Sequence, residues 1–163
     1  NEPSGNVTWN KQIKPYAKTI VKTIRKHSKN AVIVIGTPTW SQDVDVVAQS
    51  PLKGKNLMYA LHFYAGTHKE WNQEKLKTAH KKGLPVMVTE FSICDASGNG
   101  ALDKASGNQW LRLLDRYNIS YTAWSLCNKN ESSALIASTC SKTSGWTNGD
   151  LSAASKWYFN KTK

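Results

Sequence analysis

The chain has 163 residues, a formal net charge of +11, seven tryptophans and six tyrosines. This length suits one domain with a sizeable core, and no apolar run approaches the ~18 residues of a membrane span. The positive charge is best explained by solvated, lysine-rich helix faces, because the sequence has no arginine stripe, zinc-ligand spacing or aromatic RNA-binding motif. Its three cysteines form no CxxC motif or Cys/His cluster, so no metal site is predicted.

Four short apolar runs recur along the chain, with helix-like sequence between them. Their Val, Ile and Leu residues are continuous rather than alternating, which is typical of strands covered on both faces in a parallel sheet. The runs are AVIVIG (31–36), LMYALHFY (57–64), PVMVTEF (85–91) and ISYTAWS (119–125).

The segments between these runs carry apolar residues at helical spacing. Similar stripes occur at 110–117 and 151–158, and Asp150 is the expected N-cap of the last one. Helices alternating with strands predict an α/β fold, with long loops at 95–108 and 138–149. Since no linker or low-complexity tract is present, residues 1–163 are predicted to form a single domain. The clearest stripe comprises Ile13, Ala17, Ile20, Val21 and Ile24.

Two α/β architectures compete at this length. A doubly wound sheet would be complete, but it usually has a Gly-rich phosphate-binding turn after its first strand. Here the first strand ends in Gly-Thr-Pro-Thr-Trp (36–40), which is no phosphate cradle. A (β/α)8 barrel takes roughly 31 residues per βα unit, so the chain would hold about four and a half units of one.

The residues at the predicted strand ends favour the barrel and carbohydrate chemistry. The carboxyl ends of barrel strands build the active site, tryptophan faces stack on sugar rings, and a carboxylate supplies a nucleophile or a proton. Taken singly, His62 is also compatible with a core histidine and Trp124 with ordinary packing. Glu90 is harder to explain by packing, because an unpaired acid in a buried strand costs several kcal/mol. The strand-end residues are Trp40, His62, Tyr64, Glu90 and Trp124.

Five segments, in order and spanning almost the whole chain, resemble one family. They are similar to the C-terminal half of glycoside hydrolase family 5, specifically the bacterial-type endo-β-1,4-glucanases. The resemblance implies that the chain is the C-terminal half of a (β/α)8 TIM barrel with about four βα units. The segments are NEP (1–3), IGTPTWSQDVD (35–45), ALHFYAG (60–66), VTEFSICDASGNG (88–100) and WSLCNKNES (124–132).

The resemblance also implies catalytic roles for four residues. Glu2 matches the general acid/base, and Glu90 matches the nucleophile at the end of the seventh barrel strand. His62 and Tyr64 match the pair on the sixth strand, with Tyr64 expected to hydrogen-bond the nucleophile. Ser92 stands where many relatives have glycine, a mild departure in the loop after the nucleophile.

Five further residues match substrate contacts of the family. Asn1 matches the asparagine that bonds the 2-hydroxyl of the sugar being cleaved, and Trp124 matches the platform under that sugar. Trp40 matches an aromatic on the leaving-group side, whereas Lys129 and Glu131 match polar contacts towards the non-reducing end.

The implied reaction is retaining hydrolysis of internal β-1,4-glucosidic bonds, which needs neither metal nor cofactor. The ICDASGNG and SLCNK loops favour cellulose-type chains, although the same two acids also suit mannan, xyloglucan or mixed-linkage glucan. Relatives of this kind are secreted, so the resemblance implies an extracellular protein, with no membrane or nucleic-acid partner.

The family's first three strands and the body of the fourth have no counterpart in this sequence. Four strands would leave exposed edges where closure of the barrel needs eight. We therefore expect the chain to act as a homodimer of half barrels or with an N-terminal half-barrel fragment. Two alternatives stay open: a catalytically weak or inactive carbohydrate-binding half barrel, and a polyanion-binding protein that uses the positive charge.

Overall fold

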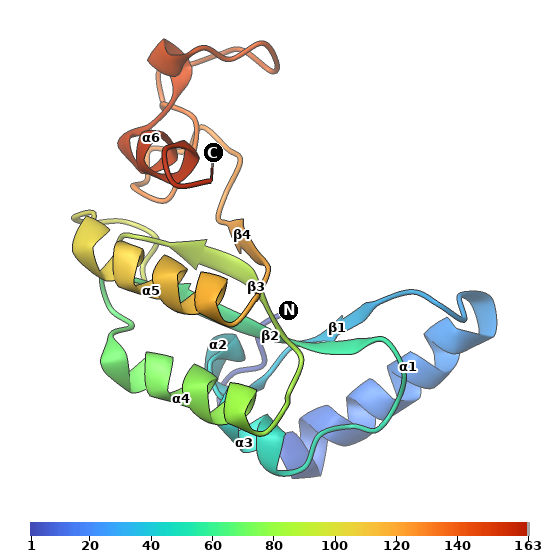
Figure 1. Ribbon diagram of the computed structural model, residues 1–163. Coiled ribbons are helices and arrows are strands. Elements are labelled where there is room, and N and C mark those ends of the chain that lie inside the picture. Colours follow the sequence, from blue (N-terminus) through green and yellow to red (C-terminus); the bar gives the residue numbers. More distant parts are fainter. Residues whose placement is uncertain (163) are drawn as a thin grey trace. The chain divides into compact units, whose positions relative to one another are not determined.

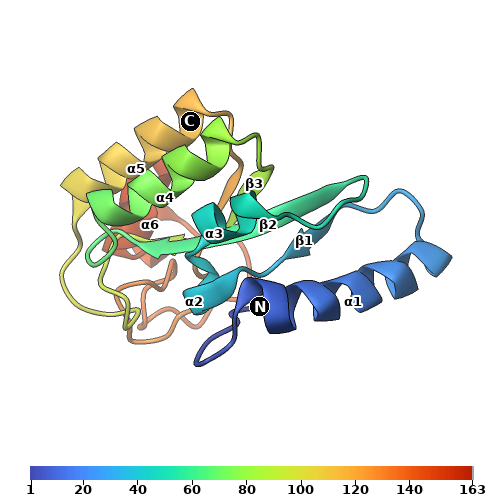
Figure 2. The same cartoon turned by 90° about the horizontal axis from the view of Figure 1, so that it is seen from below.

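The computed structural model describes residues 1–162 (Figures 1 and 2). Its four strands form one sheet in the order β1-β2-β3-β4, and β1 pairs with β2 in parallel. The elements are a π-helical turn (Trp9–Ile13), α1 (Lys14–His27), β1 (Ile33–Ile35), α2 (Pro38–Ser41), α3 (Val44–Gln49), β2 (Leu57–Tyr64), α4 (Glu70–Lys81), β3 (Val86–Ser92), α5 (Lys104–Arg116), β4 (Tyr121–Ala123), a 3-10 turn (Asn148–Asp150) and α6 (Ala153–Phe159).

The four predicted strands are confirmed, and their order supports the barrel. The sheet follows the order of the sequence without a reversal, so it has no switch point of the kind found in doubly wound sheets. Successive strands are separated by helices, as in consecutive units of a (β/α)8 barrel. None of the helices within residues 1–162 combines the length and the apolar character that crossing a membrane requires.

The described chain comprises two compact parts, and the division passes through β2 and β3. The first part contains residues 1–62 and 70–89, and the second contains residues 63–69 and, of the described chain, 90–162. The two parts are described separately below. The prediction of a single domain over residues 1–163 stays a prediction.

Helix α1, in the first part, is confirmed, but its apolar stripe is only partly covered. Pro15 lies in its first turn and basic residues in its last, as helix termini favour. Ile13 and Ala17 are buried, whereas Ile20 is 39% exposed. The helix runs alongside β1 (Figures 1 and 2). Val34 in β1 and Val32 directly before it are also exposed. This part of the chain therefore exposes apolar side chains on α1 and at β1.

Two buried aromatic residues tie the π-helical turn before α1 to β2. The Trp9 and Tyr59 rings meet edge to face, with their centroids 5.8 Å apart. The Trp9 indole donates a hydrogen bond to the Ser50 carbonyl (2.8 Å), and the Tyr59 hydroxyl bonds both backbone groups of Leu52. The loop before β2 is thereby fixed from two sides.

The core of the second part is a stack of aromatic rings. The Phe63 ring lies 4.0 Å from that of Trp110 and 5.1 Å from that of Phe91, measured between centroids. Helix α5 packs closely against Ile93, which follows β3. A Cβ at Gly107 would lie only 2.6 Å from the Ile93 side chain, so glycine permits this approach. The Asp103 carboxylate caps this helix by accepting a hydrogen bond from the Ser106 amide (2.9 Å), so the predicted loop at 95–108 ends earlier, at Asp103.

The predicted N-cap of the last helix was wrong. Ser152 caps α6, because its hydroxyl accepts a hydrogen bond from the Ser155 amide. Asp150 instead closes the preceding turn, where its carboxylate accepts from the Thr147 amide (2.7 Å) and from the Lys142 ammonium (2.8 Å). These bonds to Lys142 and Thr147 hold the pKa of Asp150 well below its usual range. The carboxylate therefore organises the loop rather than the helix.

Candidate active site

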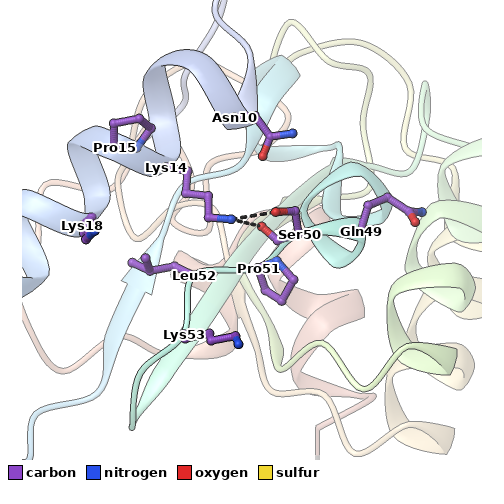
Figure 3. A pocket seen from close by; sticks show the side chains of 9 residues that line it. All are labelled: Asn10, Lys14, Pro15, Lys18, Gln49, Ser50, Pro51, Leu52 and Lys53. Carbon is purple, nitrogen blue, oxygen red and sulfur yellow. Dashed lines mark hydrogen bonds between the residues drawn. The ribbon is translucent and has the colours of Figure 1, made fainter.

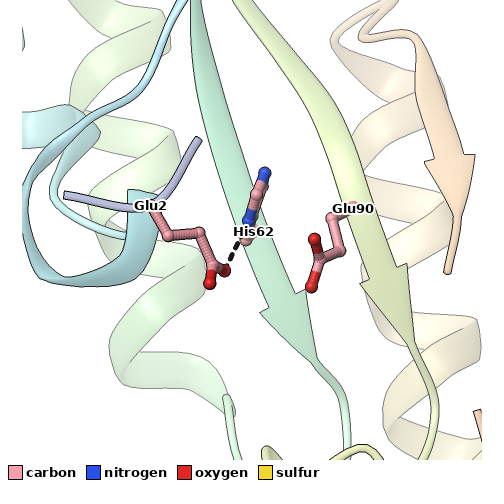
Figure 4. Close-up of side chains that lie close together, drawn as sticks. All are labelled: Glu2, His62 and Glu90. Atoms are coloured by element: carbon pink, nitrogen blue, oxygen red, sulfur yellow. Dashed lines mark hydrogen bonds and ion pairs between the residues drawn. The ribbon is translucent and has the colours of Figure 1, made fainter. Parts of the chain in front are cut away.

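In the first part, Glu2 is paired with a buried histidine on β2. The Glu2 Oε1 atom lies 2.7 Å from His62 Nδ1, and His62 Nε2 lies 2.8 Å from the Thr89 hydroxyl. A neutral ring satisfies both contacts if Nδ1–H donates to the carboxylate and Nε2 accepts from Thr89. The ring is 2% exposed, so its orientation is fixed. Figure 4 draws Glu2 from the N-terminal segment, His62 from β2 and Glu90 from β3.

The backbone around Glu2 is held by the end of β1 and by α2. The Trp40 amide donates to the Pro3 carbonyl (3.0 Å), and the Ser41 hydroxyl donates to the Asn1 carbonyl (3.0 Å). Gly36 permits this approach, because a Cβ there would lie 2.6 Å from the Asn1 carbonyl oxygen. The predicted acid therefore lies between two anchored residues.

In the second part, Glu90 is paired with a buried tyrosine. The Tyr64 hydroxyl donates to Glu90 Oε1 (2.7 Å), and both residues are buried. This bond fixes the direction in which the Glu90 carboxylate points, and a nucleophile needs such positioning. The backbone of Tyr64 is fixed in turn, because its amide donates to His68 Nδ1 (2.7 Å) and the His68 carbonyl accepts from the Trp110 indole (2.8 Å).

The predicted sugar-binding residues are exposed. Trp40, in α2, and Trp124, directly after β4, are 52% and 44% exposed. The Trp124 amide donates to the Phe91 carbonyl (2.8 Å), which joins the segment after β4 to β3. Lys129 Nζ lies 3.6 Å from Glu131 Oε1, so these two predicted contacts form a loose ion pair. Asn1 takes part through its carbonyl, as described above.

Three polar residues of the two carboxylate environments were not singled out from the sequence. Thr89 is a polar residue within an apolar strand and directly precedes Glu90, which was a usable signal. Ser41 and His68 had none, because their roles depend on backbone atoms distant in sequence.

The donors and acceptors of the Glu2–His62 and Glu90–Tyr64 pairs bond one another. Such pairs suit proton transfer and nucleophilic attack by positioned acids.

The first part also has a large surface hollow, of about 820 Å³ (Figure 3). Its charged lining groups are lysines, so it offers no acid or histidine for catalysis. The Lys14 ammonium already donates to the carbonyl (2.9 Å) and the hydroxyl (2.7 Å) of Ser50, which ties α1 to the loop before β2. The lining comprises Asn10, Lys14, Pro15, Lys18, Gln49, Ser50, Pro51, Leu52 and Lys53.

Comparison with known proteins gives consistent matches. The family described as Cellulase (glycosyl hydrolase family 5) matches residues 1–130. An endoglucanase of Clostridium saccharobutylicum is 46% identical over 154 residues, which cover 94% of this chain and 34% of that protein. A solved structure from Cytophaga hutchinsonii is 39% identical with a TM-score of 0.95, and the match covers 99% of this chain and 53% of the other.

A further solved structure is the catalytic domain of the Thermobifida fusca endoglucanase Cel5A in complex with cellotetraose. It is 31% identical with a TM-score of 0.91, and the match covers 99% of this chain and 54% of the other. The chain thus spans about a third of the length of the curated relative and about half of the solved chains. The parallel sheet with alternating helices matches part of a (β/α)8 barrel, so the predicted fold class is confirmed.

Proposed function

Because the chain belongs to glycosyl hydrolase family 5, the cellulase family, we propose that it carries the two catalytic acids of an endo-β-1,4-glucanase. The observation that carries the proposal is that each predicted acid has a buried side chain as its hydrogen-bond partner. Glu2 bonds a buried histidine, and Glu90 bonds a buried tyrosine. A carboxylate held by a buried side chain in this way is typical of a functional site.

The proposed reaction is a double displacement with retention. Glu90 attacks the anomeric carbon while Glu2 protonates the departing glycosidic oxygen, which forms a covalent glycosyl-enzyme. Glu2 then takes a proton from water, and the resulting hydroxide-like oxygen displaces Glu90. Retention needs the two carboxyl groups ~5–5.5 Å apart. In support, their partners His62 and Tyr64 are two residues apart on β2, and such residues share one face of a strand.

The substrate we propose is a cellulose-type β-1,4-glucan. Trp124 would stack under the sugar that is cleaved, and Trp40 under a sugar on the leaving-group side. Asn1 would contact the 2-hydroxyl, while Lys129 and Glu131 would bond sugars towards the non-reducing end. A relative solved with cellotetraose supports this class of substrate. We also propose that the protein acts outside the cell.

We further propose that activity needs a second half barrel, either an N-terminal half or a second copy of this chain. The chain spans about half of the solved cellulases that it matches. An apolar surface is exposed over α1 and β1 at one edge of the sheet, and an exposed strand edge invites pairing. Its residues are Tyr16, Ile20, Val32 and Val34.

A second candidate function is carbohydrate binding with little or no hydrolysis. The exposed faces of Trp40 and Trp124 favour it, because they can stack on sugars without the support that a complete barrel gives to Glu90. Polyanion binding, the third possibility, has the net charge of +11 as its only support.

The test is release of reducing sugar from carboxymethyl-cellulose, measured together with the mass of the active species in solution. We expect hydrolysis by a dimer, or by the chain combined with an N-terminal half. Cello-oligosaccharide binding without hydrolysis by either form would favour the binding function. Retention on DNA at moderate salt, without binding of cello-oligosaccharide, would favour a polyanion binder.

A further inference from the structure

The turn that follows β1 has an unusual backbone. Three successive residues without glycine's freedom, Thr39, Trp40 and Ser41, have φ angles of 55°, 53° and 58°. Left-handed conformations of this kind are disfavoured, most of all for a β-branched residue such as Thr39. They persist only where the surroundings enforce them.

Two charged residues of the first part enforce this turn. The Thr39 hydroxyl donates to Asp43 Oδ2 (2.6 Å), and the Lys75 ammonium, from α4, donates to Asp43 Oδ1 (2.6 Å). Lys75 also lies over the Trp71 ring, 5.0 Å from its centroid. Asp43 is thus held by helix α4 on one side and holds the turn on the other.

The turn at residues 39–41 also holds the segment that contains Glu2. The Trp40 amide bonds the carbonyl after Glu2, that of Pro3, and the Ser41 hydroxyl bonds the carbonyl before it, that of Asn1. Both bonds are made by residues in the left-handed conformation. If the turn relaxed, its amide and hydroxyl would no longer point at these carbonyls.

We propose that Asp43 is a positioning residue for Glu2. It keeps the left-handed turn closed, the turn fixes the backbone on both sides of Glu2, and His62 then orients the carboxylate. The same turn carries Trp40, so it fixes the position of both the proton donor and the aromatic residue assigned to the leaving-group side. This inference rests on the proposed function of Glu2 as the acid/base.

The test compares two substitutions at Thr39. Thr39→Val keeps the shape and branching but removes the hydroxyl that bonds Asp43, whereas Thr39→Ser keeps the hydroxyl. Glu74→Gln is the control, because it removes an exposed ion pair with Lys77 on the same helix as Lys75. Each variant is made in the full chain.

The first measurement is amide hydrogen exchange by NMR and does not need activity. The Trp40 amide, which bonds Pro3, should exchange about tenfold faster in Thr39→Val, and within about twofold of the unaltered rate in Thr39→Ser and Glu74→Gln. Unchanged exchange in Thr39→Val, or equal acceleration in the serine variant, would overturn the proposal.

The second measurement separates proton donation from other steps and uses the form that hydrolyses cellulose. Dinitrophenyl β-cellobioside has a leaving group that departs without a proton, whereas cellotetraose needs one from Glu2. We expect kcat/KM of Thr39→Val to fall about tenfold on cellotetraose and less than about twofold on the aryl substrate. Glu2→Gln should lower kcat/KM on cellotetraose, relative to kcat/KM on the aryl substrate, by more than Thr39→Val does.

Equal losses on both substrates would mean that Asp43 has only a general structural role. If the unaltered protein hydrolyses neither substrate, the proposed function fails, and the exchange measurement alone decides whether Asp43 fixes the Glu2 segment.

Discussion

The two predicted catalytic acids are held by different kinds of structure. Glu90 ends a strand, is buried, and bonds a tyrosine whose backbone is tied through His68 to the aromatic stack around Trp110. Glu2 belongs to no strand and is held by hydrogen bonds from a turn and from His62. Packing therefore fixes the proposed nucleophile, while polar bonds fix the proposed proton donor. Substitutions that disturb packing or polar bonds should separate the two.

The largest effect is expected at Glu90 itself. Glu90→Gln keeps the shape and the bond to Tyr64 but removes the nucleophilic oxygen charge. Hydrolysis of carboxymethyl-cellulose should fall by about 10⁴-fold or more, with circular dichroism unchanged. Glu131→Gln, at a half-exposed acid assigned to sugar contact in the second part, is the comparison variant and should lose less than about tenfold. Full activity in Glu90→Gln would refute its assignment as nucleophile.

The packing side of the comparison is tested at Trp110. Trp110→Ala removes a fully buried ring and should lower the free energy of unfolding by about 3–5 kcal/mol, measured by chemical denaturation. It also frees the His68 carbonyl, so activity should fall where the protein is still folded. Trp9→Ala, which empties a similar site in the first part, should cost comparable stability. If both variants lose activity equally when folded, packing does not distinguish the two acids.

The bond between Tyr64 and Glu90 should have a smaller effect on activity. Tyr64→Phe removes a hydrogen bond to a charged group, worth about 1.5–3 kcal/mol, so kcat should fall by roughly 10- to 100-fold. The control is Tyr59→Phe, which removes bonds to the Leu52 backbone in the first part. That variant should lose about 1 kcal/mol of stability and keep kcat within about twofold. The reverse pattern would contradict the role of Tyr64.

The sequence predicted the strand-end residues better than the structure that supports them. Continuous apolar runs located all four strands, and family motifs selected Glu2 and Glu90. The turn at 39–41 was not foreseen, because left-handed threonine, tryptophan and serine carry no recognised sequence signal. The turn depends on the adjacent Asp43, which is itself held by Lys75 from α4. The partly exposed stripe of α1 was also missed, since helical periodicity shows which face is apolar and not what covers it.

The smallest expected effect is a local change in the second part on loss of the Asp150 hydrogen bonds. The Asp150 carboxylate organises the loop between β4 and α6. Bonds to Lys142 and Thr147 lower the pKa of Asp150 in the folded state. Their contribution to the stability of the folded protein is therefore complete above the unfolded pKa of ~3.9. It is lost as the pH falls through the lower folded pKa.

The Trp146 indole, which donates to the Lys142 carbonyl (3.0 Å), reports on this loop. Its N–H resonance should keep its position through pH ~4, where an ordinary aspartate titrates, and shift only at lower pH as the folded carboxyl is protonated. In Asp150→Asn the resonance should already be shifted at neutral pH and respond little to acid. An unaltered resonance in that variant would mean that Asp150 does not hold the loop. The loop between β4 and α6 would then be held by packing rather than by this carboxylate, which would sharpen the contrast with the Glu2 segment.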